Sequence, residues 1–95
     1  MRFEWSEEKD RSNLRKHEIS FATATRVFED PNYVMVQDRE VVGEERWQTI
    51  GRIGDMTVLL VAHTVVDDEE DVIFRIISAR RATARERRRY EANTH

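Results

Sequence analysis

Four β-rich segments follow one another through the chain, and they constrain the fold more than any other feature. Branched and aromatic residues dominate these segments, which span residues 33–37, 46–53, 56–66 and 72–80. Gly54-Asp55 is typical of a tight hairpin between two of them, and the acidic run 67–71 suits a looser one. Because the links are short, the four strands are expected to form an antiparallel meander.

Two helices are predicted before the strands. Ser6 can cap a helix that extends to about His17, with acidic residues in its first turn that complement the helix dipole. Ser20 can cap a second helix over residues 21–29, which ends before Pro31.

A last helix is predicted after the strands. Thr83 and Glu86 have the spacing of a capping box, so this helix should extend to about Tyr90. The order of elements, ααββββα, keeps the helices apart from one antiparallel sheet of about four strands and predicts an α+β fold. A length of 95 residues, 39% of them hydrophobic, suits a single globular domain over residues 1–95.

The last predicted strand carries two arginines whose faces follow from alternation. Strict alternation puts Phe74 and Arg80 on one face, and it puts Arg75 between Ile73 and Ile77 on the other. Both faces are mostly apolar, which predicts an interior strand covered on both sides. An arginine in such surroundings needs a carboxylate, a carbonyl or a phosphate for its donors.

Charge is distributed unevenly along the chain. Residues 72–95 carry seven arginines and two glutamates, a balance of +5, whereas residues 1–71 carry 9 basic and 17 acidic side chains, a balance of −8. A clustered field acts locally whatever the net charge of −3. The C-terminal segment is therefore expected to bind a phosphate group or an acidic protein.

Several classes of function lack their usual signals. The chain has no cysteine, no glycine-rich phosphate loop and no nucleophile elbow, and its histidines (His17, His63 and His95) lack the spacing of a zinc site. We therefore expect no metal and no cofactor. The longest uncharged apolar stretch, residues 56–66, is shorter than the roughly 20 residues that a membrane-spanning helix needs. A cytoplasmic protein without membrane contact is expected.

The first predicted helix has a stripe of polar side chains suited to nucleic acid. Lys9, Asn13 and Lys16 fall within about 60° of one another around the helix, and His17 lies on the same side. Such groups bind phosphate and sugar oxygens, and a histidine can carry a proton. The alternative is a solvated face opposite an apolar stripe centred on Leu14, and the sequence leaves both open.

A second candidate site lies where the last strand meets the last helix. Arg80, Arg81 and the free amides after Thr83 are expected to converge on one phosphate. Arg85 belongs to a basic helix that either anchors a phosphate backbone or an acidic partner, or is simply solvated. Glu86 is either a general acid or base, or only a helix cap.

Three stretches of the chain resemble the BrnT toxin family: FEWSEEKDRSNLRKHEISF, GEERWQTIG and RIISARRATARERRRYE. The resemblance implies a RelE-like ribonuclease fold and metal-independent cleavage of RNA that arrests translation. It also implies neutralisation by a BrnA-like antitoxin with its own DNA-binding domain, in a toxin–antitoxin hetero-oligomer.

Two positions depart from the family pattern. Glu18 stands where the family usually has a glycine after Lys-His, at a helix end in the left-handed conformation. That conformation costs a glutamate about 1 kcal/mol, unless the chain leaves the helix in a different conformation. Ser6 stands where the family usually has aspartate and is a fair replacement as a cap. Neither departure removes a proposed catalytic group.

Two hypotheses of function remain in competition. In the first, the chain is a ribonuclease in which Lys16 assists and either His17 or His63 carries a proton. The guanidinium groups assigned to the phosphate are those of Arg80, Arg75 and Arg46. In the second, the chain is a non-catalytic binding module whose basic C-terminal surface holds an acidic protein partner.

Overall fold

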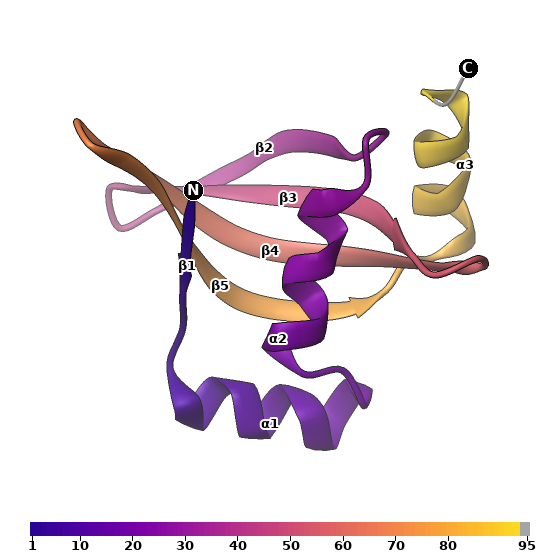
Figure 1. The fold of residues 1–95 in the computed structure, drawn as a ribbon, viewed down its shortest axis with the longest axis horizontal. Helices are drawn as coiled ribbons and strands as arrows, with labels where there is room; N and C mark the ends of the chain where they lie inside the picture. Colours follow the sequence, from indigo (N-terminus) through magenta and orange to yellow (C-terminus); the bar gives the residue numbers. More distant parts are fainter. Residues whose placement is uncertain (94–95) are drawn as a thin grey trace.

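The computed structural model describes residues 1–93, with the exception of the side chains of residues 40 and 41. One sheet forms the centre of the molecule, and helices pack on its two faces (Figure 1). The elements are β1 (Arg2–Glu4), α1 (Glu7–His17), α2 (Phe21–Ala24), the 3-10 helix η1 (Thr25–Glu29), β2 (Val34–Val41), β3 (Glu44–Ile53), β4 (Thr57–Asp68), β5 (Asp71–Arg81) and α3 (Ala84–Ala92). The predicted α+β class is confirmed.

The sheet has five strands in the order β1-β5-β4-β3-β2, so the prediction of four was wrong. The strands β2 to β5 form the expected antiparallel meander, whereas β1 pairs with β5 in parallel. With only three residues, β1 is too short to show alternation in the sequence. Phe3 holds it in place, because its ring packs on Phe28 and Phe74 at centroid distances of 5.2 and 5.8 Å.

The N-terminal helix is capped as predicted, and its C-terminus is strained. The Ser6 hydroxyl accepts a hydrogen bond from the Lys9 amide at 3.3 Å. The chain leaves α1 through Glu18, whose φ of 60° lies in the left-handed region, and the Glu18 amide donates to the Leu14 carbonyl at 2.9 Å. The glutamate therefore adopts the conformation that a glycine would adopt at lower cost.

The second predicted helix is divided in two. It is α-helical only over α2 and continues as the 3-10 helix η1. Val27 of η1 is fully buried over Gly51 of β3, where a Cβ atom would lie 2.6 Å from the Val27 Cγ1 atom. The tighter helix thus packs directly on the backbone of the sheet, a contact that the local sequence pattern does not reveal.

Each face of the sheet has its own core. On the first face, α1, α2 and η1 cover a cluster of buried residues that includes Phe21, Leu59 and Ile76. On the second face, α3 covers only one end of the sheet (Figure 1). Tyr90 of α3 packs there on Ile50 and neighbouring residues. In the described chain no helix covers the rest of the second face, which we call the open face (Figure 1).

A β-bulge in β5 determines which side chains reach the open face. Ala62 pairs with Ser78, but His63 pairs with Ile76, so Ile77 is an extra residue. The bulge resets the alternation of side chains along β5. The prediction that Arg75 and Arg80 lie on opposite faces was therefore wrong.

Candidate nucleic-acid site on the open face

Register places three arginines on the open face. Arg75 and Arg80 of β5 lie opposite Thr64 and Leu60 of β4, which share one face of that strand. Arg46 of β3 comes one residue before Trp47, and Trp47 pairs with His63 on the first face; Arg46 therefore belongs to the open face. The three guanidinium groups expected to bind phosphate thus project from the same side of the sheet.

Arg80 is the most precisely held of the three. Its Nη1 and Nη2 atoms donate to the two carboxylate oxygens of Glu86 at 2.8 and 3.0 Å, and Nη1 also donates to the Arg81 carbonyl at 3.2 Å. The hydrogen bonds to Arg80 lower the pKa of Glu86 to about 2 despite its partial burial, and the same pairing raises the pKa of Arg80. The Nε–H group and the second Nη2–H group of Arg80 have no partner among the described residues.

The other two arginines have looser carboxylate partners. Arg75 lies 3.5 Å from Glu4, and because both side chains are nearly half exposed, this ion pair contributes little to stability. Arg46 lies 3.4 Å from Glu44, yet its buried Nε atom has no hydrogen-bond partner in the described structure. An unsatisfied buried donor is costly, and such groups are often found at functional sites. These two side chains are therefore available to rearrange around an anion.

A hollow of about 220 Å³ lies between α1 and β5, beside the open face. Lys9, Lys16 and His17 line it from α1, and Ser78 lines it from the same strand face as Arg75. No ion pair joins these three basic side chains to a carboxylate within the described part of the chain. The polar stripe predicted on the first helix thus forms one side of a cationic hollow next to the arginines.

Asn13 lies in the wall of this hollow and is buried. Its side-chain amide donates to the carbonyls of Ile19 and Ala79 at 2.9 and 2.8 Å, and its oxygen accepts from the Ala79 amide at 3.1 Å. These bonds occupy the donors and the acceptor of the side chain. We therefore assign Asn13 to the attachment of α1 to β5 and leave it out of the proposed RNA contacts.

His63 lies away from the arginines, on the helix-covered face. The side chain is fully buried, with Nε2 2.7 Å from the Thr49 hydroxyl and Nδ1 3.1 Å from the Thr64 carbonyl. Burial lowers the pKa of His63, although its contact with the Thr64 carbonyl acts in the opposite direction. Packing against Phe28 and Phe74 accounts for this histidine.

Arg81 does not join the open face, and Arg85 belongs to α3 and not to the sheet. Arg81 pairs with Leu59 and thus points to the opposite side of the sheet from Arg80, where it lines a shallow pocket with Arg87. Arg85 is exposed in the first turn of α3. The sequence prediction of one phosphate site shared by Arg80 and Arg81 therefore has no support in the side-chain directions.

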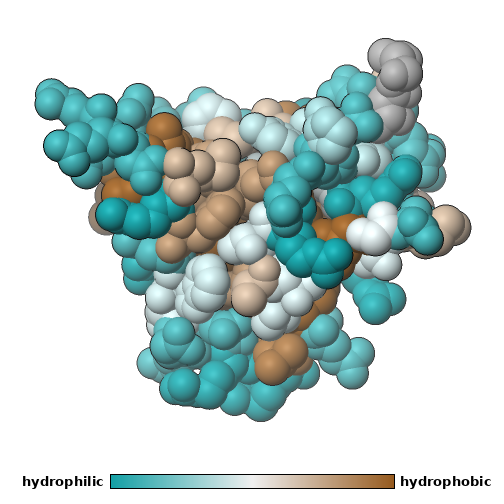
Figure 2. Space-filling model, in the orientation of Figure 1, coloured by the Kyte–Doolittle hydropathy of each residue, from teal (hydrophilic) through white to brown (hydrophobic). Residues whose placement is uncertain are grey.

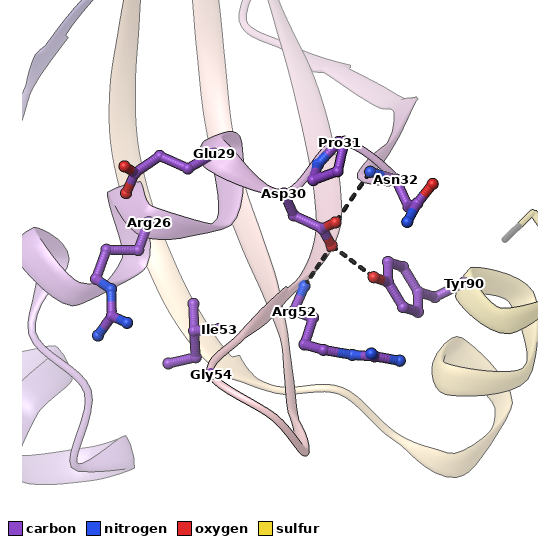
Figure 3. A pocket seen from close by; sticks show the side chains of 9 residues that line it. All are labelled: Arg26, Glu29, Asp30, Pro31, Asn32, Arg52, Ile53, Gly54 and Tyr90. Carbon is purple, nitrogen blue, oxygen red and sulfur yellow. Dashed lines mark hydrogen bonds between the residues drawn. The ribbon is translucent and has the colours of Figure 1, made fainter.

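A second hollow, of about 360 Å³, lies between η1, the end of β3 and α3 (Figure 3). The Asp30 carboxylate accepts hydrogen bonds from the Tyr90 hydroxyl at 2.5 Å, the Arg52 amide at 2.8 Å and the Asn32 amide at 2.9 Å. Burial and the hydrogen bond to Asp30 raise the pKa of Tyr90 to about 12. Burial alone would raise the pKa of Asp30, but the three hydrogen bonds lower it.

The contact between Asp30 and Tyr90 attaches α3 to the rest of the molecule. Tyr90 is the only buried side chain of that helix among the described residues, and the Arg52 guanidinium lies 5.7 Å from the centroid of its ring. From the sequence, Tyr90 was used only as a helix boundary, and Asp30 was not singled out as a site residue. Their pairing across 60 positions of the chain left no local signal.

Figure 2 shows the helix-covered side of the molecule. Figure 2, viewed from the side of α2, shows hydrophilic residues over α1 and near the ends of the sheet.

Within the described residues, no group of three or more histidine, cysteine, aspartate or glutamate side chains is placed to hold a metal ion. No described helix is both long and apolar enough to cross a membrane.

Comparison with known proteins identifies the class to which this fold and site belong. Residues 5–86 match the family model described as "Ribonuclease toxin, BrnT, of type II toxin-antitoxin system". The class is that of the ribonuclease toxins of type II toxin–antitoxin systems. Within it, the chain belongs to the BrnT family, as its sequence suggested, and an antitoxin partner and RNA targets follow from this membership.

A solved structure supports the fold. The Brucella abortus ribonuclease toxin BrnT, determined at 1.1 Å resolution, has 24% sequence identity and a TM-score of 0.63, and the match covers 87% of this chain and 97% of that chain. At this identity the likeness shows a common fold. A search of curated proteins gives no match.

Proposed function

We propose that this chain cleaves RNA on the open face, without a metal ion, and thereby arrests translation. Membership of the BrnT family makes it a ribonuclease toxin. The observation that carries the location of the site is Arg80, which is held rigidly at the edge of the open face and has two N–H groups without a partner. Adjacent donors of one guanidinium group suit two oxygens of a phosphate.

The chemistry follows from what cleavage of RNA requires. A ribose 2′-hydroxyl attacks the neighbouring phosphorus, so a proton must leave the hydroxyl, charge must be stabilised on the phosphate, and the departing 5′-oxygen must be protonated. In this proposal Arg80 stabilises the charge at the reacting phosphate and Lys16 assists. Arg75 and Arg46, which register places further along the same face, bind neighbouring phosphates of the RNA. His17, which lines the adjacent hollow, carries the proton.

The same surface suits neutralisation by an antitoxin. A partner that places acidic side chains against the open-face arginines would block RNA while replacing the loose contacts of Arg75 with Glu4 and of Arg46 with Glu44. We propose a BrnA-like antitoxin with its own DNA-binding domain, in a cytoplasmic hetero-oligomer with this toxin.

Cleavage of labelled RNA in the presence of a chelator tests the location of the site. Arg80→Ala is expected to lower kcat/KM by about 100-fold, because a charged donor to the transition state is lost. Arg88→Ala removes an exposed arginine of α3 and is the matched control, which should cleave nearly as well as the wild type. Undiminished cleavage by Arg80→Ala would remove the site from the open face.

A non-catalytic binding module is the competing function. The observation in its favour is that each open-face arginine already lies near a carboxylate of its own chain. Expression of the chain alone separates the two functions. Growth arrest that a co-expressed antitoxin relieves, and that Arg80→Ala abolishes, supports the ribonuclease; unimpaired growth with the folded wild-type chain supports the binding module.

A further inference from the structure

We infer that Glu86 is a positioning residue for the cleavage reaction, acting on the RNA only through the guanidinium group of Arg80. This inference rests on the proposed function, in which Arg80 binds the phosphate. It assigns to Glu86 a task beyond that of a helix cap. It also argues against the general-acid role that the sequence left open for Glu86.

The geometry of the ion pair fixes the plane of the guanidinium group. Two parallel hydrogen bonds join the Nη1 and Nη2 atoms of Arg80 to the two Glu86 oxygens at 2.8 and 3.0 Å. A bidentate contact of this kind restricts rotation of the guanidinium plane about the bonds of the Arg80 side chain. A single hydrogen bond would allow that rotation. The bond from Nη1 to the Arg81 carbonyl, at 3.2 Å, adds a third constraint.

The donors that remain are the pair that a phosphate requires. A guanidinium group has five N–H groups. The Nε–H group and the Nη2–H group nearest to it point in the same direction. Glu86 and the Arg81 carbonyl occupy the other three. The carboxylate therefore leaves one complete two-donor edge of Arg80 open, and the Arg80 side chain is 37% exposed.

Glu86 is itself held in place by the start of α3. Its Oε1 atom accepts from the Thr83 amide at 2.8 Å, and its own amide donates to the Thr83 hydroxyl at 3.2 Å. The capping box thus anchors the carboxylate to the helix, while the Asp30–Tyr90 contact anchors the helix to the sheet. The direction of the free Arg80 edge is set by the fold and does not depend on the ligand.

Glu86 is poorly suited to proton transfer. Both of its oxygens accept hydrogen bonds from Arg80, and a carboxylate with a pKa of about 2 stays ionised near neutral pH. A general acid needs a proton to give under those conditions. The side chain is therefore an orienting group and not a proton donor.

The test is a double-mutant cycle on RNA cleavage, combined with measurement of stability. Glu86→Ala and Glu86→Gln are each expected to lower kcat/KM by about 10- to 100-fold, because the guanidinium group loses its orientation. Glu86→Gln keeps a side-chain oxygen that accepts from the Thr83 amide, so part of the helix cap remains. A loss of cleavage in this variant is therefore not explained by loss of the whole cap. Thr83→Ala is the matched control: it removes the cap hydroxyl, leaves the ion pair and should cleave within about 3-fold of the wild type.

The Arg80→Ala background distinguishes the possible failures. If Glu86 acts through Arg80, Glu86→Ala should lower cleavage no further in that background. An equal loss with and without Arg80, or a loss in Thr83→Ala as large as that in Glu86→Ala, would overturn the positioning role while leaving the proposed function intact. Wild-type cleavage by Arg80→Ala would instead refute the proposed function itself.

Discussion

Replacement of Asn13 is predicted to destabilise the fold severely, although Asn13 is a polar residue outside the apolar cores. Asn13 is 6% exposed, and its three hydrogen bonds all go to backbone groups, one of Ile19 and two of Ala79. In Asn13→Ala these two carbonyls and one amide lose their partner in a buried place. Each buried backbone group left unsatisfied costs about 1–3 kcal/mol.

The expected loss is therefore about 3 kcal/mol or more of the free energy of unfolding, a large share of the roughly 5–15 kcal/mol that stabilises a typical domain. Asn13→Asp should be at least as destabilising, because it places a carboxylate oxygen against the carbonyls of Ile19 and Ala79, which the wild-type amide satisfies. Ser12→Ala is the control, since Ser12 is the exposed neighbour on the same helix.

Urea denaturation followed by circular dichroism measures these differences, and RNA binding measured under native conditions separates structure from recognition. Lys16→Ala should weaken RNA binding while leaving the unfolding midpoint near that of the wild type, because its exposed side chain has no ion-pair partner in the described chain. If Asn13→Ala instead keeps the wild-type midpoint and loses RNA binding, the structural role argued for Asn13 is refuted.

Three further changes follow from contacts in the fold. Tyr90→Phe should lower the free energy of unfolding by about 1–2 kcal/mol in urea denaturation, because Asp30 loses its shortest hydrogen bond; an unchanged midpoint would contradict this. Gly51→Ala should lower the thermal midpoint at a cost of about 1–3 kcal/mol, because the new Cβ atom collides with Val27. The pKa of Glu86, lowered from 4.5 to about 2, adds stability that is present above pH 4.5 and lost as the pH falls toward 2. Acid titration of Glu86→Gln should lack this dependence, about 2 kcal/mol once solvent screening of the partly exposed ion pair is allowed for.

The parts of the fold that the sequence predicted correctly are those with local signals. Ser6 and Ser20 cap their helices, and Thr83 and Glu86 form the predicted capping box, because each depends on residues three positions apart. The antiparallel meander was predicted for the same reason, since short links leave consecutive strands few other arrangements. The strand β1 escaped notice because its pairing joins residues about 71 positions apart.

The candidate site was only partly predictable. Arg46, Arg75 and Arg80 were selected by residue type and by their place in the predicted strands. Residue type does not indicate on which face of the sheet a side chain lies. Arg81, adjacent to Arg80 in sequence, points to the other face of the sheet, and His63 is a packing residue although its chemistry suits catalysis. Residue type shows what a side chain is able to do, whereas register decides where it does so.

The extra residue in β5 shows how register depends on contacts remote from the site. The strand β1 pairs with residues 73–75 of β5, and Asn13 binds both backbone groups of Ala79, so the edge of β5 is fixed on either side of the bulge at Ile77. Without the bulge, alternation would place Arg80 on the face opposite Arg75. Two attachments that are not proposed to contact RNA therefore flank the irregularity that places both guanidinium groups on one surface. This dependence explains why the arrangement follows from the whole fold and not from the arginine-rich segment alone.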